Sequence, residues 1–208
     1  MDTEAAAPIR LTAKGLATRD RIVGIAADLI HEHGVQATTN DDVRKAAGIS
    51  GSQLSHYFHD KESLVRAVVA RRAEQVLVIG RAEPTGPMDS IAALRHWASF
   101  FIERENISLT GCRFGSLASG VLKSDLDLKD VVSEGFERWE TDFRGGFAAM
   151  RDRGELRPDA DPSKLAYVIL AAYQGGMLLA QAAQSVAPLE AALNGAIDYV
   201  STFLADIH

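Results

Sequence analysis

Two short helical patterns, separated by one glycine, lie close together in the first third of the chain and constrain its fold more than any other feature. Thr39 and Asp42 are spaced as the two members of a capping box, the arrangement that starts a helix, and Ser50 and Gln53 repeat this spacing. Gly48, between the two boxes, supplies the positive φ that a tight turn needs. The segment therefore predicts a helix-turn-helix.

The second of these helices carries two different faces. Apolar residues of the motif are spaced to share one core: Val43, Ile49, Leu54 and Phe58. The small side chains of Ala46 and Ala47 allow the second helix to cross closely. The opposite face carries short polar groups: Ser52, Gln53, Ser55 and His56. A helix of this kind fits the major groove of DNA, which is about 12 Å wide, and presents its first residues to base edges.

Nearly all of the remaining sequence has helical periodicity, which predicts an all-α protein with about nine helices. The expected helices are Arg19–His33, 41–47, 51–58, 61–80, 89–106, 113–123, 128–153, 162–185 and 188–206. A breaker cluster at 83–87 is the expected link between domains. We expect a flexible arm at 1–15, a three-helix head at 16–65, and a helical bundle for ligand binding and dimerisation at 66–208.

Charge and composition exclude several classes of protein. The net charge is −6, but residues 1–72 carry +1 and residues 73–208 carry −7, so the acidity belongs to the larger C-terminal part. Cys112 is the single cysteine, which excludes an internal disulfide and a multi-cysteine zinc site, and we expect neither a metal nor a cofactor. We also expect no membrane segment, because the most apolar region, 165–183, is interrupted by polar residues and glycines. With a single cysteine, a reduced, cytoplasmic setting is the default expectation.

The head resembles the DNA-binding domain of the TetR family. The resemblance rests on Gly34-x4-Thr39-x3-Val43-x2-Ala46-Ala47-Gly48-Ile49-Ser50, followed by Leu54-x2-Tyr57-Phe58-x2-Lys61-Glu62-x-Leu64. It implies phosphate contacts from Thr39, Tyr57 and Lys61, and base reading by residues 51–57. Members of the family usually carry an aromatic residue where Ser55 stands, and often a lysine at Gly51, so the face that reads DNA is smaller here.

Several candidate DNA contacts also have a purely structural interpretation. Thr39 and Gln53 are needed for the caps whether or not they touch DNA, and Arg44, Ser52 and Ser55 fit a solvated surface equally well. Lys61 at a helix start is unfavourable to the helix dipole, which a nearby phosphate would offset. The full set of candidates is Thr39, Arg44, Ser50, Gly51, Ser52, Gln53, Ser55, His56, Tyr57 and Lys61.

The larger part resembles the C-terminal domain of the LmrA/YxaF-like branch of the TetR family. The matching stretches are 111–118 and 173–181, and the branch includes regulators that respond to drugs or flavonoid-like aromatic compounds. Aromatic residues recur on several of the expected helices, which indicates either a packed core or a pocket with Tyr173 and Gln174 as polar anchors. The candidate ligand-binding residues are Trp97, Phe101, Phe114, Leu117, Phe136, Trp139, Phe143, Tyr173, Gln174 and Met177. Cys112 fits a buried thiol better than a redox sensor.

The last two helices, at about 162–206, are expected to form a homodimer. An apolar stripe runs through Leu189, Leu193, Ala196, Ile197, Val200, Phe203 and Leu204, although such a stripe also fits the core of a single subunit. The sequence thus predicts a regulator that binds a palindromic operator in double-stranded DNA and is released by a small hydrophobic ligand. The resemblance to the TetR family implies that it is a repressor. A DNA-binding regulator without such a ligand, controlled by a protein partner or by its abundance, is the alternative. No catalytic or metal-binding spacing is found, so an enzyme is not expected.

Overall fold

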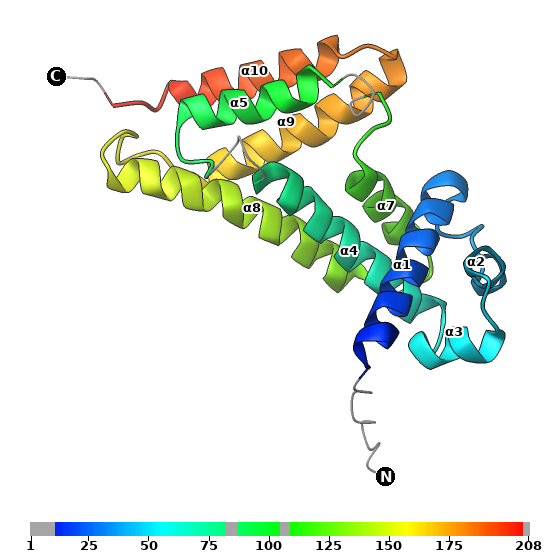
Figure 1. The fold of residues 1–208 in the computed structure, drawn as a ribbon. Helices are drawn as coiled ribbons and strands as arrows, with labels where there is room; N and C mark the ends of the chain where they lie inside the picture. The colour runs from blue at the N-terminus through cyan, green and yellow to red at the C-terminus, as the bar shows by residue number, and fades with distance from the viewer. Residues whose placement is uncertain (1–10, 82–86, 105–108, 206–208) are drawn as a thin grey trace. The chain divides into compact units, whose positions relative to one another are not determined.

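The computed structural model describes residues 11–81, 87–104 and 109–205 (Figure 1). Over these residues the regular secondary structure is α-helical, apart from one isolated β-bridge. Nine α-helices lie within this part of the chain, which confirms the all-α class predicted from the sequence. The chain divides into two compact units, Met1–Val68 and Val69–His208, and the division falls inside α4 (Lys61–Arg81). The breaker cluster at 83–87 lies outside the described residues, apart from Pro87.

The smaller unit contains α1 (Ala13–His33), α2 (Asn40–Ala47), α3 (Gly51–Tyr57) and the start of α4. Helix α1 packs on α2, and α2 packs on α3. Their apolar faces meet in one core, formed by Ile22, Val23, Ala26, Ile30, Val43, Ala47, Leu54, Phe58, Leu64 and Val65. Of the motif residues expected to share this core, Ile49 is only half-buried.

Helix α1 begins earlier than the sequence predicts. Thr12 is its N-cap, and the Thr12 hydroxyl accepts a hydrogen bond from the backbone N–H of Gly15 at 3.2 Å. The apolar stripe starts later because the first turns face solvent, and Leu16 is 56% exposed. Residues 13–15 therefore belong to a helix and not to the expected arm, whereas residues 1–10 lie outside the described part of the chain.

The larger unit is a bundle in which α9 is the central helix. Helix α9 packs against both α8 and α10, α10 also packs on α5, and α7 packs on α8. Figure 1 shows α5 and α10 side by side. The bounds of these helices are Ile91–Ile102 for α5, Arg113–Leu122 for α7, Lys129–Asp152 for α8, Pro162–Ala183 for α9 and Ala187–Ser201 for α10.

The last helix ends before the predicted limit at 206 because the following residues pair with another segment. The backbone N–H of Arg157 donates to the carbonyl oxygen of Phe203 at 2.9 Å, and the N–H of Ala205 donates to Glu155 at 2.9 Å. These bonds enclose the isolated antiparallel bridge between Leu156 and Leu204. The chain after α10 is thus fastened to the segment after α8, a contact that local sequence patterns do not encode.

Candidate nucleic-acid interface and aromatic interior

Both helices of the predicted motif begin with the expected capping boxes. At α2, the Thr39 hydroxyl oxygen accepts from the Asp42 N–H at 3.2 Å, and the Thr39 N–H donates to Oδ2 of Asp42 at 2.9 Å. At α3, the Ser50 hydroxyl accepts from the Gln53 N–H at 3.2 Å, and the Ser50 N–H donates to Oε1 of Gln53 at 3.0 Å. Each box gives partners to two backbone donors, which fixes where each helix starts.

The turn between the helices is held from two sides. Gly48 adopts the left-handed conformation (φ 63°, ψ 38°), and its N–H bonds back to the carbonyl oxygens of Arg44 and Lys45. Nη1 of Arg21, on α1, donates to the carbonyl oxygen of Ala47 at 2.8 Å. The last turn of α2 is therefore fastened to α1, and this fixes the position from which α3 departs.

The face of α3 opposite the core is open to solvent. Leu54 is 4% exposed and faces inward, whereas the predicted reading residues Ser52, Gln53, Ser55 and His56 are all exposed. Gly51 is exposed too, and a Cβ at this position would meet only the Cδ of Arg44, at 4.0 Å. A polar, accessible face at the start of α3 is the geometry that major-groove reading requires.

The outer face of α2 contains an ion-pair cluster that the sequence reasoning missed. The Asp41 carboxylate binds Arg44 at 2.6 Å and Lys45 at 2.7 Å. The hydrogen bonds from Lys45 and Arg44 lower the pKa of Asp41, and Asp41 in turn raises the pKa of Lys45. The i,i+3 and i,i+4 spacing of these residues was the signal that could have revealed the cluster. Both cations are thus engaged within the helix in the absence of DNA.

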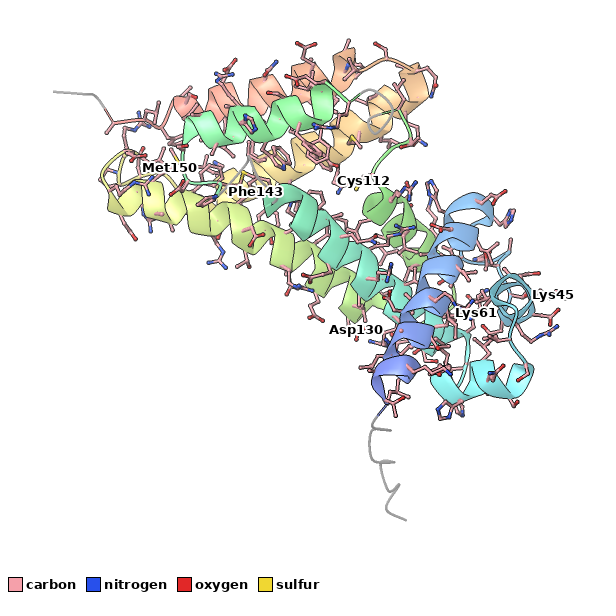
Figure 2. The ribbon with its side chains drawn as sticks, viewed as in Figure 1. Lys45, Lys61, Cys112, Asp130, Phe143 and Met150 are labelled. Atoms are coloured by element: carbon pink, nitrogen blue, oxygen red, sulfur yellow. The ribbon has the colours of Figure 1, made fainter. Side chains whose placement is uncertain are left out.

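The remaining candidates lie at the ends of the helices. The hydroxyl of Thr39 donates to Oδ2 of Asp42 at 2.6 Å, so its proton is already used by the cap. Nζ of Lys61, the first residue of α4, donates to the carbonyl oxygen of Gln36 at 3.1 Å. Tyr57 is half-buried at the end of α3. Lys45 and Lys61 are labelled in Figure 2.

Five aromatic side chains from α5, α8 and α9 meet inside the larger unit: Trp97, Phe101, Trp139, Phe143 and Tyr173. The ring of Tyr173 lies 4.8 Å from that of Phe101 and 5.1 Å from that of Trp139. Phe143, labelled on α8 in Figure 2, lies 5.1 Å from Trp97. All five side chains are buried, and their edge-to-face and tilted contacts are favourable for aromatic rings. We call these five residues the aromatic cluster.

The other predicted ligand-binding residues lie around the aromatic cluster or apart from it. Phe114 and the half-buried Phe136 form a ring pair 4.8 Å apart, and among the described residues no ring contact joins this pair to the aromatic cluster. Leu117 and Met177 are buried, and Gln174 is half-buried. The sequence-predicted set is therefore divided between a central cluster and a separate pair.

A polar contact joins the start of α7 to α9. Sγ of Cys112 accepts hydrogen bonds from the Gly115 N–H at 3.3 Å and from Nε2 of Gln174 at 3.5 Å. Burial raises the pKa of the Cys112 thiol and that of the Tyr173 phenol. Both groups are therefore neutral at pH 7, which favours a structural role for Cys112 over redox sensing.

Comparison with known proteins identifies the family. Residues 22–68 match the family model described as bacterial regulatory proteins of the tetR family, and residues 88–196 match the model described as the tetracyclin repressor-like C-terminal domain. The chain belongs to the TetR family. It is therefore a transcriptional regulator with a DNA-binding helix-turn-helix, and not an enzyme. The resemblance seen in the sequence of the head is confirmed.

Individual relatives of this TetR-family chain agree with the assignment. The transcriptional regulator UidR of Escherichia coli K12 is 25% identical over 158 residues, covering 74% of this chain and 76% of UidR. The transcriptional repressor KstR2 of Rhodococcus jostii is 36% identical over 76 residues, covering 36% of this chain and 37% of KstR2. A TetR regulator from Chloroflexus aurantiacus superimposes with a TM-score of 0.76 at 27% identity, covering 93% of this chain and 98% of that one.

The apolar stripe that was expected to form the dimer lies largely on α10, and in this TetR-family chain most of it is buried within the subunit. The outer face of α9 is apolar and exposed. Leu189, Leu193, Ala196, Ile197 and Val200 of α10 are buried within the subunit, because they pack against the subunit's own helices. Leu204, at the end of the predicted stripe, is 39% exposed. Three exposed large apolar residues lie together on α9: Tyr167 (58% exposed), Leu178 (65%) and Leu179 (57%). A Cβ at Gly175, which lies between them, would have nothing within 4 Å. We call Tyr167, Ala171, Gly175, Leu178 and Leu179 the α9 outer face.

Helix α9 is long and apolar enough, by length and composition alone, to cross a membrane. However, 44% of its most apolar window is buried inside the fold, and the helix packs against α8 and α10. This is the environment of a core helix. Within the described part of the chain, no group of three or more His, Cys, Asp or Glu side chains is arranged to hold a metal ion.

Proposed function

We propose that this chain is a dimeric repressor that binds a palindromic operator through α3 and is released by a small hydrophobic ligand held in the larger unit. It acts in the cytoplasm, where its DNA is accessible. The observation that carries the proposal is the solvent-exposed face of α3, with Ser52, Gln53, Ser55 and His56 presented from a helix whose start is fixed by a capping box. Repression, as opposed to activation, is supported by the name of the relative KstR2.

The α9 outer face supports the dimer. Leu178 and Leu179 project from a helix that already packs against both α8 and α10, so they have no further helix of the described bundle to bury them. Gly175 and the exposed Ala171 add no bulk between the leucines and Tyr167, so a second copy of the helix can approach closely. A two-fold dimer presents two copies of α3 to half-sites about 34–36 Å apart, or somewhat more.

The aromatic cluster supports a hydrophobic ligand. Its rings, with the Tyr173 hydroxyl and the Gln174 amide beside them, provide the apolar lining and few polar anchors typical of small-molecule sites. A ligand that separates these rings would alter the packing of α5, α8 and α9 together. It shifts the regulator off DNA only to the extent that it binds the released conformation better. We also propose that the larger unit belongs to the LmrA/YxaF-like branch, which its sequence resembles.

Selection of bound sequences from random duplex DNA by the full-length protein tests the central claim. We expect an inverted repeat to be enriched at moderate salt. If no sequence is enriched, the chain is not an operator-binding repressor, and the proposal fails.

A thermal-shift screen with hydrophobic and aromatic compounds tests ligand control. A ligand present at 100 times its Kd raises the free energy of unfolding by about 2.7 kcal/mol. A compound that raises the Tm is then added to the operator complex, where we expect it to release the DNA. If no compound of this class stabilises the protein, the ligand part fails and the regulator without a small-molecule ligand becomes the better interpretation.

A further inference from the structure

The amide of Gln53 is held in one orientation by the start of its own helix. Oε1 of Gln53 accepts the Ser50 N–H at 3.0 Å, while the Gln53 N–H donates to the Ser50 hydroxyl at 3.2 Å. The Ser50 hydroxyl also lies 3.0 Å from that of Ser52. The oxygen end of the exposed Gln53 side chain thus points back at the backbone, and its Nε2 group, with two N–H donors, is left for an outside partner.

We infer that Gln53 reads the operator only as a hydrogen-bond donor, through Nε2, and selects guanine at one position of each half-site. This inference rests on the proposed function and states which base edge its reading helix recognises. Guanine presents two adjacent acceptors, N7 and O6, in the major groove, and a lone donor group is best satisfied by this edge.

The alternative for a glutamine is the bidentate contact with adenine, in which the amide oxygen accepts from N6 while the nitrogen donates to N7. That contact requires Oε1 to turn into the groove. The Ser50 N–H would then lose its side-chain partner at a helix start, where no carbonyl of the preceding turn replaces it. Because α3 spans only Gly51–Tyr57, its start is a large part of the whole helix, and releasing the cap would loosen the element that positions the other reading residues.

The substitution Gln53→Glu separates the two roles of the side chain. Glutamate is a standard partner in a capping box, so it preserves the bond from the Ser50 N–H. It replaces the donor group by a second acceptor oxygen, and acidic side chains in the major groove accept from N4 of cytosine. The variant should therefore keep the fold of the head and reverse the hydrogen-bonding preference at one base pair.

The experiment is selection from random duplex DNA with the full-length wild type and with Gln53→Glu, followed by affinities for four duplexes that differ only at the position whose preference changes. We expect the wild type to prefer guanine by about five-fold or more, the lower end for a specific base contact. In Gln53→Glu this preference should be lost, with cytosine becoming the favoured base. Far-UV circular dichroism and the Tm confirm that the variant is folded.

Gln36→Glu serves as the matched control, because it adds the same charge at an exposed site of the same unit. It should weaken binding to all four duplexes without changing their order. Adenine as the wild-type preference at the position affected by Gln53→Glu would overturn the inference, as would an identical pattern for both proteins. If the wild type enriches no operator, the proposed function itself fails. If the wild type and Gln53→Glu enrich the same operator, only this inference is overturned.

Discussion

Oδ1 of Asp41 lies 2.6 Å from Nη2 of Arg44 on the exposed side of α2, and the same carboxylate binds Nζ of Lys45 at 2.7 Å. The first helix of a helix-turn-helix crosses the DNA backbone, so we propose that these two cations contact phosphates when the operator is bound. On this proposal, Asp41 competes with phosphate for Arg44 and Lys45. Because all three side chains are solvent-accessible, exchange of one anion for the other requires little structural change.

Asp41→Asn should raise the affinity for every duplex, specific and random, several-fold. The released Arg44 and Lys45 gain phosphate contacts, so the dependence of log K on log salt should steepen by about 1 to 2. Binding is measured by fluorescence anisotropy across a salt series. Glu32→Gln is the control, because it also removes one negative charge and Glu32 is an exposed residue of α1. An equal effect of both substitutions would show that net charge, and not the Asp41 cluster, limits affinity.

Lys61→Gln should weaken binding to all sequences and reduce the salt slope by about 1, the change expected for one lost phosphate contact. Lys61 Nζ lies 3.1 Å from the Gln36 carbonyl oxygen, which holds the ammonium beside the loop before α2. The same anisotropy series measures the effect. Retained affinity with an altered base preference would mean that Lys61 contacts bases and not the backbone.

The capping box of α2 should make the head sensitive to acid. Hydrogen bonds from the Thr39 hydroxyl and backbone hold the pKa of Asp42 below its ordinary value. A carboxylate with a lowered pKa stabilises the fold above the ordinary carboxyl pKa, and this contribution is lost as the pH falls through the lowered value. Asp42→Asn should thus be less stable than the wild type at neutral pH, and the difference should shrink in acid. Urea unfolding across pH measures it.

Thr39→Ala should destabilise the protein by about 1 kcal/mol at neutral pH, the usual cost of losing an N-cap hydroxyl. The hydroxyl accepts from the Asp42 N–H and donates to its carboxylate, so both bonds disappear together. Urea unfolding gives the free energy. If stability is unchanged while affinity for all DNA falls, the hydroxyl acts on phosphate more than on the cap.

Charges on the α9 outer face should separate the proposed dimer. Leu178→Glu and Leu179→Glu each place a carboxylate where we propose that a second copy packs, and desolvating it would be unfavourable. Sedimentation velocity should show monomers, and operator affinity should fall with them. Leu122→Glu on α7 is the matched control, since Leu122 is 50% exposed outside this face. If both variants remain dimers, the interface lies elsewhere on the subunit.

Two glycines of α8 should respond oppositely to alanine. A Cβ at Gly135 would overlap Cζ of Phe114, so Gly135→Ala should cost about 1 to 3 kcal/mol through overpacking. Nothing lies within 4 Å of a Cβ at Gly145, and Gly145→Ala should stabilise the helix by about 0.5 to 1 kcal/mol. Thermal and urea unfolding report both values. An unchanged free energy of unfolding in Gly135→Ala would show that α7 readily moves away from α8.

Local chemistry made much of the head predictable. The pairs Thr39–Asp42 and Ser50–Gln53 form the predicted boxes, and Gly48 forms the predicted left-handed turn, because each depends on contacts within a few residues of the chain. The start of α1 was missed since Leu16 is exposed and gives no apolar stripe. The ion pairs of Asp41 are local too, but their spacing was not used.

The sequence by itself determined the all-helical class, the capping boxes of α2 and α3, and the family of the head, because these depend on short-range periodicity and on motif residues. Only the tertiary structure decided which apolar stripe is covered: Leu189 lies inside the subunit, whereas Leu178 faces solvent. It also brought Gln174 to Cys112, across 62 residues of sequence. Periodicity identifies an apolar face but not the helix that meets it, since burial depends on the path of the whole chain.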